Sequence, residues 1–194
     1  MLKSKIKTYR NVIKSDSYLT HLNRLMLSDN FGWRWIATTA GDDDNLDDNL
    51  NGTFYHNLIR CKEYCSEHTN VFMPLIYECI DLSGYKGYTI ERARLGLILN
   101  RGKPIVHAPH VDYREPHKTI LFYLNKSDGA TFFYKEEMSL ENGDPKRYEQ
   151  YEVIGQNLFE QNSMVVFDGH TYHSSSAPIH HELRIALNIN LISI

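Results

Sequence analysis

The sequence predicts a mainly β protein with flanking helices (α+β), in which a barrel or double-sheet jelly roll is packed by N-terminal helices. After Tyr85 the chain breaks into short runs rich in Ile, Leu, Val, Phe and Tyr, separated by turn signals such as NRGKP, KSDG and ENGDP, which is typical of antiparallel β-structure. Before Tyr85 the apolar residues recur at helical spacing. We expect residues 1–194 to form a single domain, with residues 1–85 as helical support and residues 86–194 as the jelly-roll core.

The N-terminal part predicts two or three helices. In SDSYLTHLNRLML the apolar residues recur at helical spacing, and Ser15 or Asp16 would cap the first turn. Residues 54–82 predict one or two further helices, with Pro74 near the start of the second. Residues 41–52 contain five aspartates but fit neither the glycine nor the glutamate position of an EF-hand. We therefore expect a solvated polar loop there.

The part after Tyr85 predicts six or more strands. They are the runs YTIERARLGLILN, KTILFYLN, ATFFYK, YEVIGQNLF, SMVVFDG and LRIALNINLISI. In the last run one face is apolar, and the other carries Arg184, Ala186, Asn188 and Asn190. Such a strand can direct the guanidinium group of Arg184 into a cavity. The longest irregular stretch, residues 136–150, is interpreted either as a lid or binding loop or as an insertion.

Composition limits the classes of function. The net charge is −3 at pH 7 and no basic stripe is present, so no nucleic-acid partner is expected. No apolar run reaches the roughly 18 residues of a membrane span, and the N-terminus lacks the apolar segment of a secretory signal. The three cysteines include no CxxC pair, which indicates free thiols and a cytoplasmic location. The expected partner is a small-molecule or peptide substrate, and no feature indicates an oligomeric state.

The stretch HAPHVDYREPH, residues 107–117, holds three histidines and two acidic residues. Pro109 lies inside it, which disfavours a helix. In an extended chain, residues two positions apart point the same way, so His110 and Asp112 project together and His107 points to the opposite side. His110 and Asp112 are therefore the expected metal ligands, whereas His107 and His117 are interpreted as rim or structural residues.

A metal site needs at least one more ligand from elsewhere in the chain. Facial iron sites use two imidazoles and one carboxylate, and leave the other positions open. Four histidines near the C-terminus could supply the second imidazole: His170, His173, His180 and His181. Ten residues separate His173 from Arg184.

Together, HVD, KTILFYLN, DGATFFY, MVVFDGHTYHSSS and RIALNINL resemble the Fe(II)/2-oxoglutarate dioxygenases. The likeness is strongest to the prolyl-4-hydroxylase-like branch, including its small phage-type members, and covers roughly residues 90–194. It implies a double-stranded β-helix core, with Fe(II) as cofactor and 2-oxoglutarate and O2 as cosubstrates. It also implies that His110, Asp112 and His173 are the catalytic metal ligands, with His170 as the rival for the third position.

The resemblance also implies the cosubstrate contacts. Arg184 matches the residue that binds the far carboxylate of 2-oxoglutarate, and Tyr123 occupies the position of a tyrosine that hydrogen-bonds the same group. Thr119 shares a strand face with Tyr123 and is expected to line the pocket as well. Asn100, at the end of the preceding strand, matches a position that often touches the cosubstrate.

The activity that the resemblance implies is hydroxylation of a C–H bond, with release of succinate and CO2. A carboxylate at Asp112 favours hydroxylation, and a prolyl residue is the substrate suggested by analogy. Two alternatives stay open. One is a cupin-like metal-dependent dioxygenase or isomerase that does not use 2-oxoglutarate, and the other is a non-catalytic jelly-roll binding module.

Overall fold

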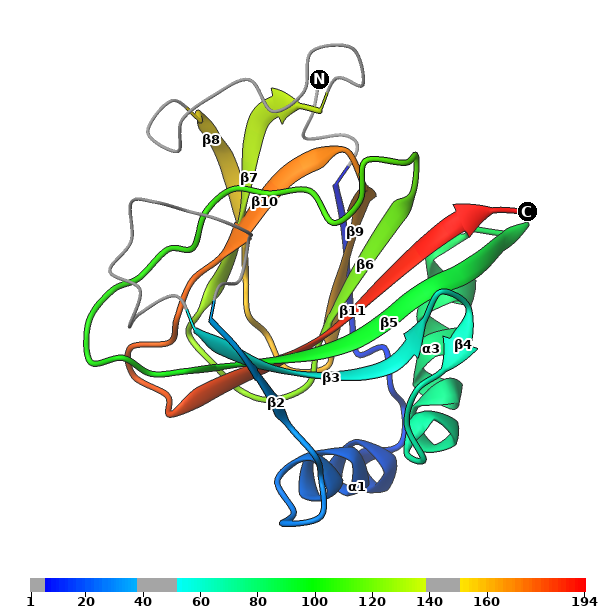
Figure 1. Ribbon diagram of the computed structural model, residues 1–194. Coiled ribbons are helices and arrows are strands. Elements are labelled where there is room, and N and C mark those ends of the chain that lie inside the picture. Colours follow the sequence, from blue (N-terminus) through cyan, green and yellow to red (C-terminus); the bar gives the residue numbers. More distant parts are fainter. Residues whose placement is uncertain (1–5, 38–51, 139–150) are drawn as a thin grey trace.

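Two antiparallel sheets face each other in the computed structural model, which describes residues 6–37, 52–138 and 151–194 (Figure 1). The large sheet has the spatial order β1 (Lys7–Arg10), β9 (Ser163–Asp168), β6 (Lys118–Tyr123), β11 (Leu183–Ser193), β5 (Tyr88–Leu99), β3 (Thr53–Arg60) and β2 (Arg34–Ile36), and β4 (Glu63–Tyr64) pairs with β3. The small sheet is β10 (Thr171–Ser175), β7 (Ala130–Glu137) and β8 (Val153–Leu158). This arrangement confirms the predicted mainly β fold with a jelly-roll core.

Alternation along the central strands separates two apolar layers. The odd-numbered residues of β11 from Ile185 to Leu191, and Ile120 and Phe122 of β6, belong to the core on the outer side of the large sheet. Leu121 and Tyr123 of β6 point the other way, into a smaller core with Phe133 of the small sheet. The inner face of β11 is thereby left for polar side chains, as its sequence predicts.

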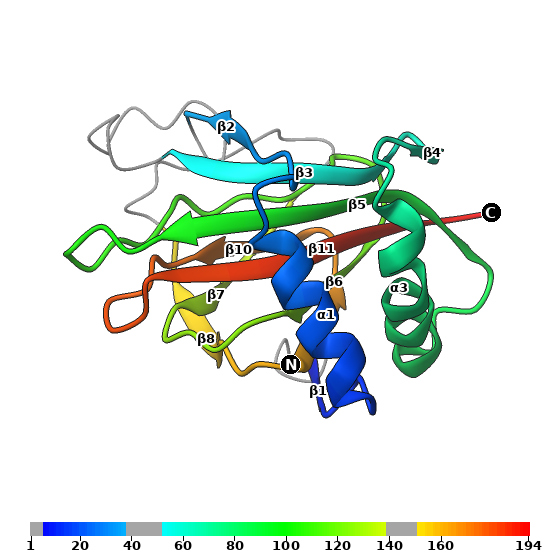
Figure 2. The ribbon, with the colours of Figure 1, turned by 90° about the horizontal axis from the view of Figure 1, so that it is seen from below.

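Two helices, α1 (Asp16–Met26) and α3 (Thr69–Ser83), cover the outer face of the large sheet (Figures 1 and 2). Ser15 caps α1 by accepting a hydrogen bond from the backbone N–H of Tyr18. Leu22 of α1 and Phe72 of α3 are fully buried against the sheet, and burial of such a side chain contributes about 1.5–3 kcal/mol. The inner face of the sheet is therefore free for the site.

Pro74 lies inside α3 rather than at its start. Near it, the hydroxyl of Tyr18 donates to the carbonyl of Val71 at 2.7 Å and accepts from the N–H of Leu75 at 3.3 Å. A proline perturbs the hydrogen-bond ladder of a helix, and here a side chain from α1 bridges the two backbone groups. The same contact ties the two helices together.

The expectation of a helical N-terminal part is wrong outside α1 and α3. Residues 6–37 and 52–64 also contain the strands β1 to β4. All of β3 except Thr53 lies within the stretch 54–82 that predicts helix, but β3 pairs with β5 along six registered positions and buries Leu58 and Ile59. Pairing with a long neighbouring strand thus outweighs the local periodicity. Whether the whole chain is one domain stays a prediction.

Three other expectations concern the remaining segments. The acidic segment 41–52 and the loop 136–150 lie largely outside the described residues. Cys61, Cys65 and Cys79 are free thiols. Neither described helix is long and apolar enough to cross a membrane.

Candidate metal and cosubstrate site

His110 and His173 face each other across a pair of backbone hydrogen bonds. The N–H of each residue donates to the carbonyl of the other at 3.0 Å, so both side chains emerge on the same face. Their rings lie 4.7 Å apart between centroids. The segment of His110 thus pairs with β10, which brings together two histidines that are distant in the sequence.

A hydrogen bond at Nδ1 of each ring determines which nitrogen carries the proton. Nδ1 of His110 lies 3.1 Å from the carbonyl of Ala108, and Nδ1 of His173 lies 3.1 Å from the carbonyl of Thr171. A carbonyl only accepts, so each Nδ1 carries the proton and each Nε2 presents a lone pair. Such outer contacts are typical of histidines that bind metals.

Asp112 completes the cluster. One of its carboxylate oxygens lies 3.9 Å from Nε2 of His173, and the possible ligand atoms of His110, Asp112 and His173 all lie within 4.8 Å of one another. Two imidazoles and one carboxylate converging at this distance form the donor set of a facial iron site. The structure therefore brings together the three residues that the sequence predicts as ligands.

The carboxylate of Asp112 is held by three side chains. Arg92 donates to one oxygen at 2.6 Å, Asn190 donates to the other at 2.8 Å, and Asn188 donates to both. Burial alone would raise the pKa of Asp112, but Arg92 and the nearby histidines hold it well below its usual range. Asp112 is therefore a fixed, ionised carboxylate that could bind a metal.

Burial has the opposite effect on the histidines. It lowers the pKa of His173 to about 4, with a further contribution from His110. The pKa of His110 is also lowered, mainly by burial, although Asp112 opposes the shift. Both rings are neutral near pH 7, as metal binding requires.

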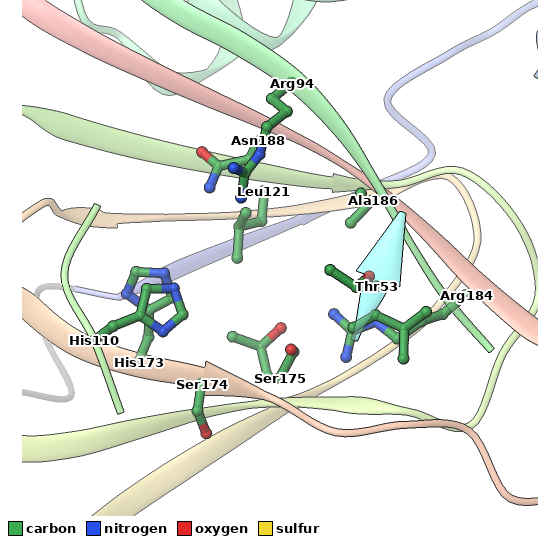
Figure 3. Close-up of a pocket in the computed structure, with 13 residues that line it drawn as sticks. Thr53, Arg94, His110, Leu121, His173, Ser174, Ser175, Arg184, Ala186 and Asn188 are labelled. Atoms are coloured by element: carbon green, nitrogen blue, oxygen red, sulfur yellow. The ribbon is translucent and has the colours of Figure 1, made fainter. Parts of the chain in front are cut away.

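A pocket extends from the two histidines between the sheets (Figure 3). Its walls come from β3, β5, β6, β7, β10 and β11, and from the segment of His110. The lining residues are Thr53, Arg94, Gly96, Ile98, His110, Leu121, Thr131, His173, Ser174, Ser175, Arg184, Ala186 and Asn188. Figure 3 shows the histidines at one end and Arg184 at the other.

Arg184 is a buried cation at the end of the pocket away from the histidines. Its side chain is held by the carbonyls of Ala130 and Ser176, to which Nη1 donates at 2.7 and 3.1 Å. Gly129 permits this approach, because a Cβ there would lie 2.9 Å from Cδ of Arg184. Burial lowers the pKa of Arg184 to about 10, so it remains charged. Within residues 6–37, 52–138 and 151–194, no carboxylate forms an ion pair with it.

Tyr123 lies beside this end of the pocket without lining it. Its hydroxyl donates to the hydroxyl oxygen of Thr131 at 2.9 Å and accepts from Asn157 at 3.3 Å. Its ring stacks on Phe159, over which the guanidinium of Arg184 also lies. Thr131 itself lines the pocket. Thr131 thus stands between Tyr123 and the pocket.

Two other predicted cosubstrate residues have different contacts. Thr119 accepts a hydrogen bond from Asn190 at 3.2 Å and so supports the ligand Asp112. Asn100 donates to the carbonyls of residues 179 and 181 and accepts from the N–H of Gly102. Neither side chain is among those that line the pocket, and contact of either residue with a cosubstrate stays a prediction.

The other histidines considered as ligands are not part of the cluster. The ring of His170 contacts the carbonyl of Arg114 at 2.9 Å, so the structure favours His173 over this rival. His107 and His117 are buried and are not among the clustered ligands. His180 and His181 are exposed beside Asp128.

The sequence reasoning missed four polar groups of the site. They are the side chains of Arg92, Arg94 and Thr131, and the amide of Asn188, which donates to Asp112. The alternation of Arg92, Arg94 and Gly96 along YTIERARLGLILN was the available signal, because it places two arginines on one face of a strand.

The fold was compared with known proteins. No protein-family model and no curated protein matches the sequence. An oxidoreductase of the 2OG-Fe(II) oxygenase family from Burkholderia pseudomallei has a TM-score of 0.65 at 11% identity, over 97% of this chain and 85% of that chain. A Pseudomonas putida prolyl-4-hydroxylase has a TM-score of 0.58 at 11% identity, over 98% of this chain and 93% of that chain.

A third solved structure contains ligands. The epimerase SnoN in complex with Fe3+, alpha ketoglutarate and nogalamycin RO has a TM-score of 0.64 at 14% identity, over 97% of this chain and 79% of that chain. At these identities the similarity concerns the fold. The chain has the fold of the solved 2OG-Fe(II) oxygenases, which include a prolyl-4-hydroxylase.

Proposed function

We propose that the protein is an Fe(II)- and 2-oxoglutarate-dependent dioxygenase that hydroxylates a C–H bond and releases succinate and CO2. The observation that carries the proposal is one pocket with a buried His-Asp-His cluster at one end and an arginine without a carboxylate partner among the described residues at the other. A dicarboxylic acid that chelates a metal matches both ends.

His110, Asp112 and His173 would hold Fe(II). The fit is supported by the two Nε2 atoms with free lone pairs and by the ionised carboxylate. Three protein ligands leave further positions for the cosubstrate and for oxygen. Arg92 and Asn190 would keep Asp112 oriented as a ligand.

Arg184 would bind the far carboxylate of 2-oxoglutarate. Because Nη1 is engaged by two carbonyls, the donors on Nη2 and Nε remain for a carboxylate, which the guanidinium can bind as a fork. Thr131 would add a hydroxyl donor, because its oxygen already accepts the proton of Tyr123. Tyr123 would position Thr131 rather than touch the cosubstrate.

Bound Fe(II) and 2-oxoglutarate would supply the oxidising chemistry by which O2 is reduced and a C–H bond is hydroxylated. The protein supplies geometry, charge and exclusion of water. Leu121, Ile98 and Ala186 give the pocket apolar walls, which strengthen the electrostatic contacts inside it. The ligand complex of the SnoN epimerase supports this cofactor assignment by analogy.

A prolyl residue in a peptide is one candidate substrate, supported by the fold match to the prolyl-4-hydroxylase. The other similar structures include a carbocyclase and an epimerase, so small-molecule substrates are equally compatible with the fold. The cupin-like alternative, which does not use 2-oxoglutarate, leaves the buried Arg184 without a role.

Formation of succinate tests the proposed function. The protein is incubated with Fe(II), O2, 2-oxoglutarate and pooled candidate substrates, and succinate is measured by mass spectrometry. We expect succinate that depends on all three additions and rises with at least one pool. Protein that binds Fe(II) yet forms no succinate above the metal-free control would contradict the proposal.

A further inference from the structure

β5 places a second arginine in the wall of the pocket. Arg94 is registered opposite Asn188 of β11, and both residues line the pocket. Figure 3 shows their side chains next to each other, away from Arg184. Gly96 and Ile98 follow on the same face of β5, so Arg94 is the cationic member of this wall.

Arg94 forms no ion pair with a carboxylate in the described part of the chain. Its neighbour Arg92 forms the ion pair with Asp112 at 2.6 Å, whereas the recorded contact of Arg94 is with the ring of Tyr55, 5.8 Å from its centroid. Burial and the proximity of Arg92 lower the pKa of Arg94, although the more distant carboxylate of Asp112 opposes the shift, so its charge is only partly compensated. A partly buried cation of this kind favours an anionic ligand.

The net charge of the site also favours an anionic ligand. Among the described residues around the pocket, three arginines, Arg92, Arg94 and Arg184, stand against one carboxylate, that of Asp112. Fe(II) and 2-oxoglutarate carry opposite charges of equal size, so binding both leaves the positive excess in place. In the proposed mode, the carboxylates of 2-oxoglutarate are taken by the metal and by Arg184. Arg94 is left for another molecule.

Asn188 adds an acceptor beside this cation. Its Nδ2 donates to both oxygens of Asp112, which fixes the orientation of the amide because a carboxylate only accepts. Its buried Oδ1 has no hydrogen-bond partner among the described residues. A buried acceptor without a partner is unfavourable, so a ligand with an N–H or O–H donor would be favoured there.

We propose that Arg94 binds a carboxylate or phosphate group of the primary substrate, and that Asn188 Oδ1 accepts a hydrogen bond from a donor next to it. The inference rests on the proposed function and deepens it, because it assigns the substrate to small anionic molecules such as amino acids, hydroxy acids or phosphate esters. A neutral internal peptide segment does not satisfy Arg94.

Simple anions test the inference before the substrate is known. Protein is loaded with Mn(II) and 2-oxoglutarate, and trifluoroacetate and inorganic phosphate are titrated at constant ionic strength. Paramagnetic relaxation of the 19F and 31P signals reports binding near the metal, and trifluoroacetamide is the neutral control. We expect enhanced relaxation for at least one anion and none for the amide. The anion that binds more tightly shows whether the substrate group is a carboxylate or a phosphate.

Variants assign the effect to Arg94. In Arg94→Gln the affinity for the anion should fall about ten- to a hundredfold, and Arg94→Lys should retain most of it because the charge remains. Arg24→Gln is the matched control, because Arg24 is exposed on α1. The affinity for 2-oxoglutarate should be the same in all three variants.

Several outcomes would overturn the inference. They are no relaxation enhancement in the wild type, equal enhancement by the neutral amide, and unchanged anion binding in Arg94→Gln, which would indicate direct coordination to Mn(II). A loss of 2-oxoglutarate affinity in Arg94→Gln would assign Arg94 to the cosubstrate instead. Failure of the proposed function appears separately, as wild-type protein that does not bind 2-oxoglutarate with Mn(II).

Discussion

Replacing Arg184 with methionine should remove the stabilisation of the protein by 2-oxoglutarate while leaving metal binding intact. The side chain is 3% exposed, so solvent cannot replace its contact with the cosubstrate. Methionine fills much of the same space without charge. The far carboxylate of 2-oxoglutarate would then lie in the pocket without its cation, whereas the ligands His110, Asp112 and His173 would be unchanged.

The magnitude follows from the type of contact. A hydrogen bond to a charged group contributes about 1.5–3 kcal/mol, so the Kd for 2-oxoglutarate should rise about ten- to a hundredfold. At a ligand concentration of about 100 times Kd, the wild type gains about 2.7 kcal/mol of unfolding free energy. If Kd rises fiftyfold, the gain at the same concentration falls to about 0.7 kcal/mol.

Urea unfolding of Mn(II)-loaded protein, with and without 2-oxoglutarate, measures this gain. Each variant is compared with itself, so the loss of the hydrogen bonds from Arg184 to Ala130 and Ser176 cancels. Arg24→Met on the surface of α1 is the control and should behave as the wild type. An equal gain from 2-oxoglutarate in Arg184→Met and wild type would refute the assignment of Arg184.

Four further variants probe the surroundings of the site. Tyr123→Phe should weaken 2-oxoglutarate binding less than Thr131→Val, because Tyr123 acts through Thr131; calorimetric titration should give about a two- to tenfold loss for the threonine variant. Arg92→Met should lower the unfolding free energy of metal-free protein by about 1.5–3 kcal/mol, and Mn(II) should recover part of it in urea unfolding. Gly169→Ala should lower the unfolding free energy by about 1–3 kcal/mol, seen as a lower melting temperature, because a Cβ there would overlap the ring of His117.

Controls separate these effects from general damage. Gly155→Ala introduces a methyl group with no atom within 4 Å, so its thermal stability should stay near that of the wild type. A larger loss for Tyr123→Phe than for Thr131→Val would place Tyr123 in direct contact with the cosubstrate. Destabilisation of Arg92→Met that Mn(II) does not reduce would argue that Arg92 serves packing rather than Asp112.

The parts of the site that could be predicted from sequence are those with a local pattern. The alternation of β11 places Arg184 on the inner face, and HVD places His110 and Asp112 on one side of an extended chain; the structure agrees with both placements. The choice of His173 over His170 rested on spacing to Arg184, and the geometry favours it.

The rest depends on register between strands, which no single segment encodes. Arg92 reaches Asp112 because β5 lies next to β11, where it is registered beside Asn190. Thr119 shares its face with Tyr123, as predicted, but lies opposite Asn190 and accepts a hydrogen bond from it, a contact that its own segment does not reveal. The local sequence of β3 predicts helix, because the strand that pairs with it, β5, lies elsewhere in the chain and leaves no signal in that segment.

Anaerobic titration with Fe(II) and 2-oxoglutarate tests the central claim most directly. Chelation of the iron by the cosubstrate should produce a weak visible charge-transfer band in the wild type. The band should be lost in His173→Ala and retained in His170→Ala, because the ring of His170 contacts the backbone carbonyl of Arg114 and is not part of the cluster. No band in the wild type, or an undiminished band in His173→Ala, would contradict the site described above.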